Sequence, residues 1–187
     1  MQFYKLSMDM ERENDVILHC NNCSEIGLNT FVTGKYYSES INIIFFYDEK
    51  EGNVWTDYLA NDKGWFIVSE RLKVLLQKMN SNIQFIDIRI YDIENQDTNK
   101  TYYIANILKV VDALCLDKSE YFETYIEGKG MIYSVIKYGI YENKTEGADV
   151  FKLDNWQQVP IFVSENFKRE IEINNYTGMA FRKIAVE

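Results

Sequence analysis

The chain has 187 residues, of which 47% are apolar and 15% aromatic, and its 20 basic and 29 acidic side chains give a net charge of −9 at pH 7. This composition predicts a single globular domain over residues 1–187 and argues against a disordered chain. The acidic balance argues against a nucleic-acid-binding protein, because phosphate contacts need clustered Lys and Arg, and the lack of any run of roughly 18 apolar residues argues against a membrane span.

The first half of the chain opens with strand-like segments. Residues 2–8 and 15–20 are weak candidates, whereas residues 41–49, INIIFFYDE, are a strong one because β-branched and aromatic side chains dominate the run. Turn-forming residues follow at 50–53 and 61–64. We therefore expect strands separated by short turns up to about residue 64.

The segment that begins at Ser69 has the pattern of a short amphipathic helix. Ser69 is a good N-cap, because its hydroxyl can accept a hydrogen bond from a free amide of the first turn, and an acidic residue follows it. Apolar side chains then recur at helical spacing, at Leu72, Leu75, Leu76 and Met79. An Asn-Ser-Asn run ends the predicted helix.

A second copy of this plan occurs near the end of the chain. Ser164 is the predicted cap, and Phe167 and Ile171 form a shorter apolar stripe. Residues 178–184 then parallel residues 82–88. The sequence leaves two interpretations open: a duplicated Ser-capped helix–turn–strand unit, or coincidence, since Ser-Glu is a common way to begin a helix.

Most of the remaining chain has strand character. Ile alternates with charged residues in 85–91, and residues 101–111 and 130–141 are rich in β-branched and aromatic side chains. Turn signals lie at 94–100 and 142–147. Many strands with two to three helices predict an α+β fold. We expect a mainly antiparallel sheet, because the intervals between strands rarely hold a crossover helix.

The three cysteines and the single histidine do not make a metal site. His19, Cys20 and Cys23 lie close together, but a structural zinc needs a fourth ligand and only the distant Cys115 remains. An odd number of cysteines fits a disulfide framework poorly and a reducing compartment well. We therefore expect reduced, metal-free thiols, no cofactor and a cytoplasmic protein.

No catalytic set stands out in the sequence. His19 is the sole candidate base for a nucleophile, and no Gly-x-Ser-x-Gly elbow occurs. Gly34-Lys35 lacks the glycine spacing of a phosphate-binding loop. Carboxylate pairs are plentiful among 29 acidic residues, and none is distinguished by its surroundings. We therefore expect no enzymatic activity.

The aromatic residues are the best candidates for partner binding. Tyr and Trp bury a large area at little entropic cost and are enriched at binding hot spots. Core packing is the alternative for each of them. The candidates are Trp65, Trp55 and Trp156, which lie near predicted loops, and Tyr58 and Tyr121, which we expect at the surface.

Three stretches together resemble a known family, immunity-protein family eleven of bacterial polymorphic toxin systems. They are DYLANDKGWFIVSERLKVLL at 57–76, YYIANILKVVDALCLDKSEY at 102–121 and IFVSENFKREIEINNYTGMAFRKI at 161–184. The order and spacing of the stretches carry the resemblance. The chain departs from the family pattern at Cys115, where an acid is expected, and at Phe66, where proline is common.

The resemblance implies a non-enzymatic protein that binds and neutralises a cognate toxin, and the −9 charge would suit a basic toxin. It assigns no binding residues, because toxin-facing surfaces vary with the toxin, and it leaves Ser69 and Ser164 as structural caps. The alternatives are a small enzyme or ligand-binding protein that shares the fold, or a scaffold subunit with a permanent partner.

Overall fold

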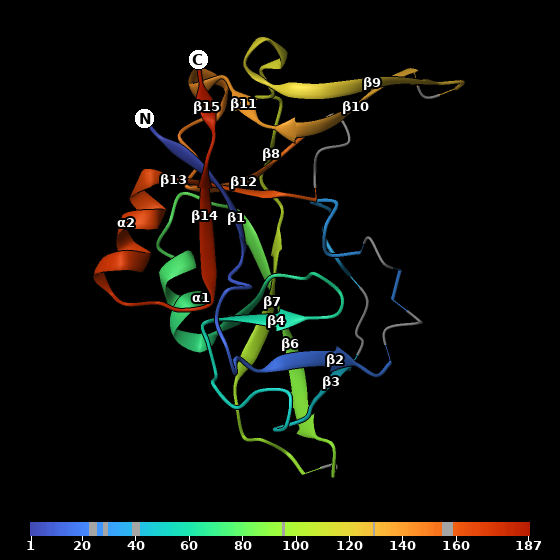
Figure 1. Cartoon of the computed structure of the whole chain (residues 1–187), viewed down its shortest axis with the longest axis vertical. Helices are drawn as coiled ribbons and strands as arrows, with labels where there is room; N and C mark the ends of the chain where they lie inside the picture. The colour runs from blue at the N-terminus through green and yellow to red at the C-terminus, as the bar shows by residue number, and fades with distance from the viewer. Residues whose placement is uncertain (23–25, 28–29, 39–41, 95, 129, 155–158) are drawn as a thin grey trace.

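The computed structural model describes residues 1–22, 26–27, 30–38, 42–94, 96–128, 130–154 and 159–187 (Figure 1). Strands dominate and two α-helices accompany them, so the fold is α+β, as the sequence predicts. Antiparallel strand pairs outnumber parallel ones. The chain builds a barrel, a separate sheet and a projecting hairpin.

Six strands close into a barrel in the lower half of Figure 1. In order around the barrel they are β2 (Ile17–Cys20), β3 (Ile43–Tyr47), β6 (Ile83–Asp92), β7 (Tyr102–Ile107), β5 (Ile67–Ser69) and β4 (Tyr58–Asn61). Its core includes Trp65, Phe45 and Phe31, all of them buried. Closure pairs both edges of each strand, which protects the strands from non-native pairing.

A five-stranded sheet lies next to the barrel. Its order is β14 (Met179–Lys183), β1 (Phe3–Met8), β13 (Ile161–Ser164), β12 (Val150–Leu153) and β8 (Val110–Val111). One face packs Phe3, Phe151 and Phe162 against Tyr138 and Ile140. Short elements complete this end of the molecule, namely β11 (Gly139–Ile140), β15 (Ala185–Val186) and the 3₁₀ turns Leu116–Lys118 and Glu142–Lys144.

The two helices, α1 (Glu70–Leu76) and α2 (Glu165–Ile173), join the barrel to the sheet (Figure 1). Leu72 and Leu76 of α1 and Phe167 and Ile171 of α2 belong to one buried cluster, which also includes side chains of β5, β7, β1 and β13. Burial of a side chain of this size contributes about 1.5–3 kcal/mol. The apolar stripes predicted from the sequence therefore form the central core.

The duplicated unit predicted as one of two interpretations is present in the fold. An antiparallel hairpin, β4–β5, precedes α1, and the antiparallel hairpin β12–β13 precedes α2. Ser69 is the N-cap of α1 and accepts from the Leu72 backbone N–H at 3.2 Å, and Ser164 accepts from that of Phe167 at 3.2 Å. A strand follows each helix, β6 in the first unit and β14 in the second.

The N-terminal strand β1 completes the second unit. In the first unit β7 lies between β5 and β6, and Tyr103 pairs with both Val68 and Asp87. In the second unit β1 lies between β13 and β14, and Tyr4 pairs with both Val163 and Lys183. The two units thus have the same strand arrangement. The strand of the second unit that corresponds to β7 is β1, which comes from the opposite end of the chain.

Several elements differ from the sequence-based prediction. The predicted strands 101–111 and 130–141 are each interrupted, at 108–109 and at Tyr138, and the helix predicted to reach Met79 ends at Leu76. Strands β4, β12 and β9 (Glu120–Ile126) were not predicted. β3 and β6 pair in parallel. This is possible because β4, β5 and α1 lie between them in the chain and return it to the end of the barrel at which β3 began.

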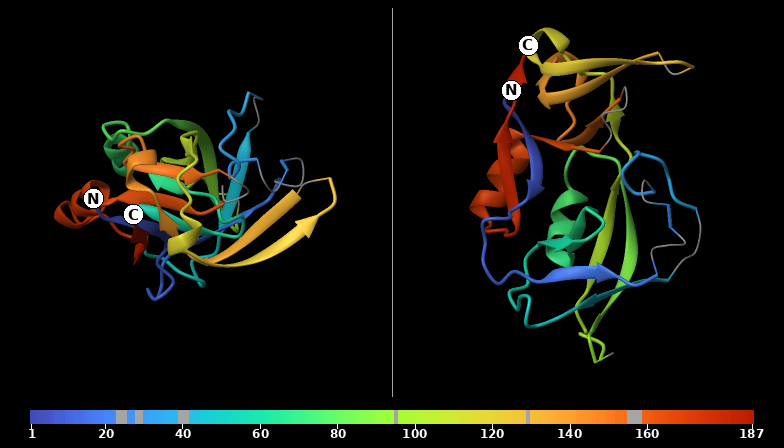
Figure 2. Two further views of the ribbon diagram at one scale, coloured as in Figure 1. Left: turned by 90° about the horizontal axis from the view of Figure 1, so that it is seen from above. Right: turned by 45° about the vertical axis from the view of Figure 1, so that its right-hand side comes forward.

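A two-stranded hairpin made of β9 and β10 (Gly130–Lys137) projects from the top of the molecule, away from barrel and sheet (Figures 1 and 2). We call residues 120–137 the arm. Within the part of the chain that the structure describes, β9 and β10 pair only with each other.

Candidate functional site

Asp57 is the buried centre of a hydrogen-bond cluster that includes Ser69, Arg71 and Thr177. The Asp57 side chain is only 7% exposed. Its Oδ1 accepts hydrogen bonds from Ser69 Oγ at 2.7 Å and from Arg71 Nε at 2.6 Å, and its Oδ2 accepts from the Thr177 backbone N–H at 2.9 Å. Burial alone would raise the pKa of Asp57, but the hydrogen bonds from Arg71, Ser69 and Thr177 outweigh it and keep the pKa below its ordinary value.

The second unit repeats this cluster with other residues, which indicates a structural role. Asp149 Oδ1 accepts from Ser164 Oγ at 2.5 Å and from Asn166 Nδ2 at 3.3 Å, and Asp149 Oδ2 accepts from the Asn80 backbone N–H at 3.0 Å. Asn80 follows α1, just as Thr177 follows α2. Each aspartate therefore binds its own cap serine and the turn of the other unit.

Replacing Ser69 with alanine should lower the free energy of unfolding by about 1 kcal/mol, because the Leu72 N–H loses its capping acceptor. Partner binding should be unchanged at temperatures where the variant is folded. Urea denaturation and a binding titration measure the two effects, with Ser164→Ala as the matched variant in the other unit. Loss of binding by folded Ser69→Ala would mean that the hydroxyl has a functional role.

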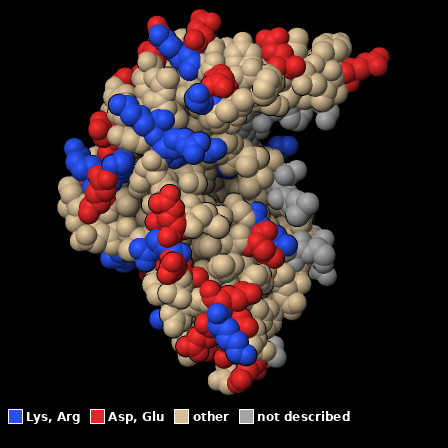
Figure 3. Space-filling view, viewed as in Figure 1, with Lys and Arg blue, Asp and Glu red and all other residues tan. Residues whose placement is uncertain are grey.

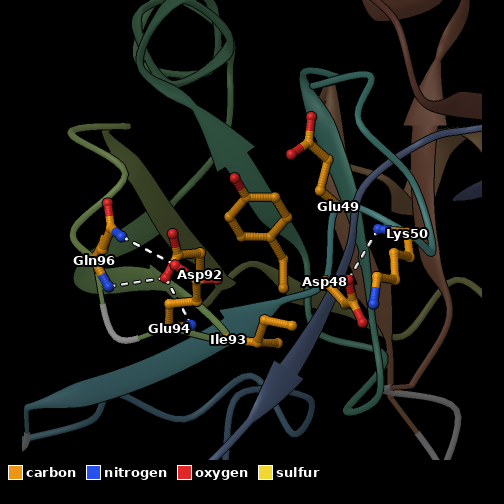
Figure 4. A pocket seen from close by; sticks show the side chains of 8 residues that line it. Asp48, Glu49, Lys50, Asp92, Ile93, Glu94 and Gln96 are labelled. Atoms are coloured by element: carbon orange, nitrogen blue, oxygen red, sulfur yellow. Dashed lines mark hydrogen bonds between the residues drawn. The ribbon is translucent and has the colours of Figure 1, made fainter.

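An acidic pocket lies at the end of the barrel where β3 and β6 terminate (Figure 4). Because these strands are parallel, with Tyr47 opposite Asp92, the turns that follow them meet at one edge. Acidic side chains from both turns line a cavity of about 540 Å³, together with Lys50, Ile93 and Gln96. The four acids are Asp48, Glu49, Asp92 and Glu94.

The turns themselves fix two of these carboxylates. Asp48 accepts from the Lys50 backbone N–H at 2.9 Å, and Asp92 accepts from the N–H groups of Glu94 at 2.9 Å and Gln96 at 2.8 Å. Such aspartate–backbone bonds are typical of Asx turns. The pocket thus presents preorganised negative charge that can attract a Lys or Arg side chain.

One aromatic residue, Tyr47, lines the pocket beside the acids, and Trp55 packs against it outside the lining. The pKa of Tyr47 is raised above its ordinary value by burial and by the negative charges of Glu49 and Asp92. The ring of Trp55 lies edge-on to Tyr47 at 5.0 Å and near Tyr102 at 5.8 Å, and the Lys100 ammonium lies 5.5 Å from Trp55. One cation–aromatic contact, of the type that a basic partner would add, therefore lies next to the pocket.

The other aromatic candidates are dispersed. Trp65 and Tyr58 are 1% and 5% exposed, so neither side chain is available to a partner in the folded chain. Tyr121 lies in the arm, far from the acidic pocket (Figure 1). Trp156 lies outside the described residues. The sequence suggested Trp55 but gave no signal for the acidic pocket, because the pocket depends on parallel pairing of β3 with β6.

The cysteines partly contradict the expectation of free thiols. Cys20 is disulfide-bonded, so its predicted reduced state is wrong. Cys23 lies outside the described residues. Cys115 is a free, buried thiol. Because of this disulfide, the odd number of cysteines no longer supports a reducing compartment.

The geometry supports neither a metal site nor a general base that would activate a nucleophile. No group of three His, Cys, Asp or Glu side chains in the described part of the chain could hold a metal ion. The Nε2 atom of His19 lies 2.6 Å from a Glu51 carboxylate oxygen, not beside a hydroxyl or thiol. His19 is thus not placed to activate a nucleophile.

No helix among the described residues is long and apolar enough to cross a membrane. No curated protein matches the chain. The family model described as "Immunity protein family (Imm11)" matches residues 2–186, and so includes both Ser-capped units, the acidic pocket and the arm. The chain therefore belongs to the Imm11 immunity protein family.

Proposed function

We propose that this protein binds a cognate toxin domain and neutralises it by forming a complex, without catalysing a reaction. The match of the family model to residues 2–186 carries the proposal. The site supports it, because the Asp57 cluster acts as a structural joint and the acidic pocket offers charge and aromatic surface but no paired nucleophile and base. The predicted cytoplasmic location remains untested.

The acidic pocket suits a basic segment of the toxin. Its lining has four carboxylates against one lysine, on a chain of net charge −9. Opposite charge accelerates diffusional encounter and is screened by salt, whereas dissociation depends more on close packing. An interface of roughly 1,200–2,000 Å² in total would be enough for tight inhibition.

Neutralisation should require about one chain per toxin domain, because a binder is consumed whereas a catalyst turns over. The test is a titration of the purified protein against the toxin domain encoded beside its gene, with toxin activity and complex mass as readouts. Full neutralisation by a small substoichiometric fraction would indicate an enzyme that destroys the toxin or its product. Failure to form any complex would reject the proposal.

The variant Asp48→Asn with Glu49→Gln should slow association about threefold to tenfold and change dissociation little. The matched control, Glu165→Gln with Glu172→Gln, removes the same charge from exposed positions of α2 and should alter the rate less than twofold. Stopped-flow association at several salt concentrations measures this. Equal effects of both variants would mean that overall charge, not the pocket, steers the toxin.

A further inference from the structure

The arm exposes apolar side chains on both of its faces. Phe122 and Tyr125 are 68% and 72% exposed, and Met131 and Ile136 are 46% and 48% exposed. The strand register places Tyr125 opposite Met131 on one face and Phe122 opposite Ser134 on the other. Figure 2 shows the arm extending away from the body in both views.

Such a ribbon gains little stability from the rest of the fold. A two-stranded hairpin is marginally stable in water unless it packs on something, and clustered exposed apolar side chains mark interaction sites. The Tyr121 and Tyr133 rings contact each other edge-on at 5.3 Å, which stiffens the half of the arm nearer the body. The arm is thus suited to pack against another protein.

A basic groove lies at the root of the arm. Its cavity of about 360 Å³ is lined by Lys5, Lys118, Lys137, Arg182 and Lys183, and no acidic residue lines it. Its apolar lining consists of Ile136, Tyr138, Ile184 and Ala185, of which Ile136 and Ala185 are exposed. Since Ile136 and Lys137 belong to β10, groove and arm form one continuous surface.

Three of the five cations have no acidic partner among the residues that the structure describes. Lys118 Nζ lies 3.0 Å from Glu187 and Lys137 Nζ lies 2.5 Å from Glu120. Within the described ranges, Lys5, Arg182 and Lys183 form no ion pair. Figure 3 shows a band of Lys and Arg over the upper part of β1 and β14, whereas Asp and Glu are more numerous toward the lower end of the molecule.

We propose that the groove and the arm together bind an extended, acidic segment of a protein partner. Carboxylates of the segment would pair with Lys5, Arg182 and Lys183, and its apolar side chains would pack on the exposed Ile136. β14 is an edge strand, and a free edge favours an extended ligand that can add to it. This surface is separate from the acidic pocket, so the proposal goes beyond toxin binding there.

An acidic protein segment fits better than a nucleic acid. The net charge of −9 repels a long polyanion, and phosphate binding gains little from an apolar floor. A short peptide with alternating acidic and apolar residues matches both properties of the groove. Its carboxylates can pair with Lys5, Arg182 and Lys183, and three such contacts are enough for a short peptide. Nucleic-acid binding instead depends on many phosphate contacts.

The test uses the full chain and a fluorescein-labelled decapeptide of alternating Glu and Val, followed by fluorescence anisotropy at low salt. The variant Arg182→Gln with Lys183→Gln should bind about tenfold more weakly. The control Lys35→Gln with Lys78→Gln removes the same charge from exposed positions outside the groove and should bind within about twofold of the parent. Ile136→Ser should weaken binding about threefold through lost apolar contact.

Three outcomes would overturn the proposal: no binding of the peptide by the parent protein, equal losses in the groove and control variants, or tighter binding of a labelled thymidine decanucleotide. Circular dichroism of each variant checks that it is folded. The assay contains no toxin, so the peptide-binding proposal and the proposed toxin neutralisation can each be rejected independently of the other.

Discussion

Replacing Asp57 with alanine should lower the free energy of unfolding by about 3 kcal/mol. The change removes the acceptor of Ser69 Oγ, of the Arg71 guanidinium and of the Thr177 backbone N–H. The Arg71 side chain is 54% exposed and regains water, so the ion pair itself contributes about 1 kcal/mol or less. The remaining loss of stability comes from the Ser69 hydroxyl and the Thr177 backbone N–H, which lose their acceptor. Both groups lie near the joint between the two units. Urea denaturation followed by circular dichroism measures the loss.

Asp87→Ala is the control for this prediction. Asp87 is exposed on β6 and its removal should change stability by no more than about 0.5 kcal/mol. If Asp57→Ala were as stable as the control, the aspartate would not hold the two units together. An effect on partner binding without an effect on stability would instead make Asp57 a functional residue.

The Asp57 contribution should also depend on pH. The pKa of Asp57 is lower in the folded chain than in the unfolded chain, where it is about 3.9. Its stabilising effect is therefore fully present above that value and is lost as the pH falls through the folded value. Asp57→Asn cannot titrate, so its stability should decline less steeply below about pH 4 than that of the parent.

Replacing Trp65 with alanine should cost about 4 kcal/mol of stability. Trp65 is 1% exposed, and its ring lies edge-on to Phe31 at 4.8 Å and to Phe45 at 6.1 Å inside the barrel. Its backbone is fixed by Asn61, whose Oδ1 accepts from the Trp65 N–H at 3.0 Å and whose Nδ2 donates to the Trp65 carbonyl at 2.8 Å. The rigid backbone limits collapse of the cavity, which raises the cost. Thermal and urea unfolding measure it.

Trp65→Phe is the matched variant and should cost only about 1–2 kcal/mol, because it keeps most of the ring volume. Among the described residues, the indole Nε1 of Trp65 has no hydrogen-bond partner, so its removal sacrifices no bond. Both variants should bind the partner normally at temperatures where they are folded. Weak binding by folded Trp65→Phe would contradict a purely structural role.

Local features of the fold were predictable from the sequence. Ser69 and Ser164 are the N-caps of two short helices, because capping depends on a serine and the first turn that follows it. The buried stripe of Leu72, Leu75 and Leu76 also follows from spacing alone. The parallel between residues 82–88 and 178–184 matches the register in the structure, since Phe85 and Phe181 occupy equivalent positions in β6 and β14.

Features that depend on distant pairing were not predictable. Trp55 and Trp65 both lie near turns, and only closure of the barrel buries one and leaves the other at the rim. β9 has apolar and aromatic residues on both faces, so it lacks the alternation that identifies a strand packed on one side. Asp57 and Asp149 each open a hairpin, but the hairpins differ in length, which hides the shared Asp–Ser pair.

The position of β1 has a consequence for the order of folding. The first Ser-capped unit is continuous from β4 to β7, so it can form from contacts between near neighbours in sequence. The second unit needs β1 to meet β13 and β14, which the ribosome makes much later than β1. Loop closure over such a separation is slow, so the first unit should form while β1 is still unpaired. We therefore expect insertion of β1 between β13 and β14 to be a late step of folding.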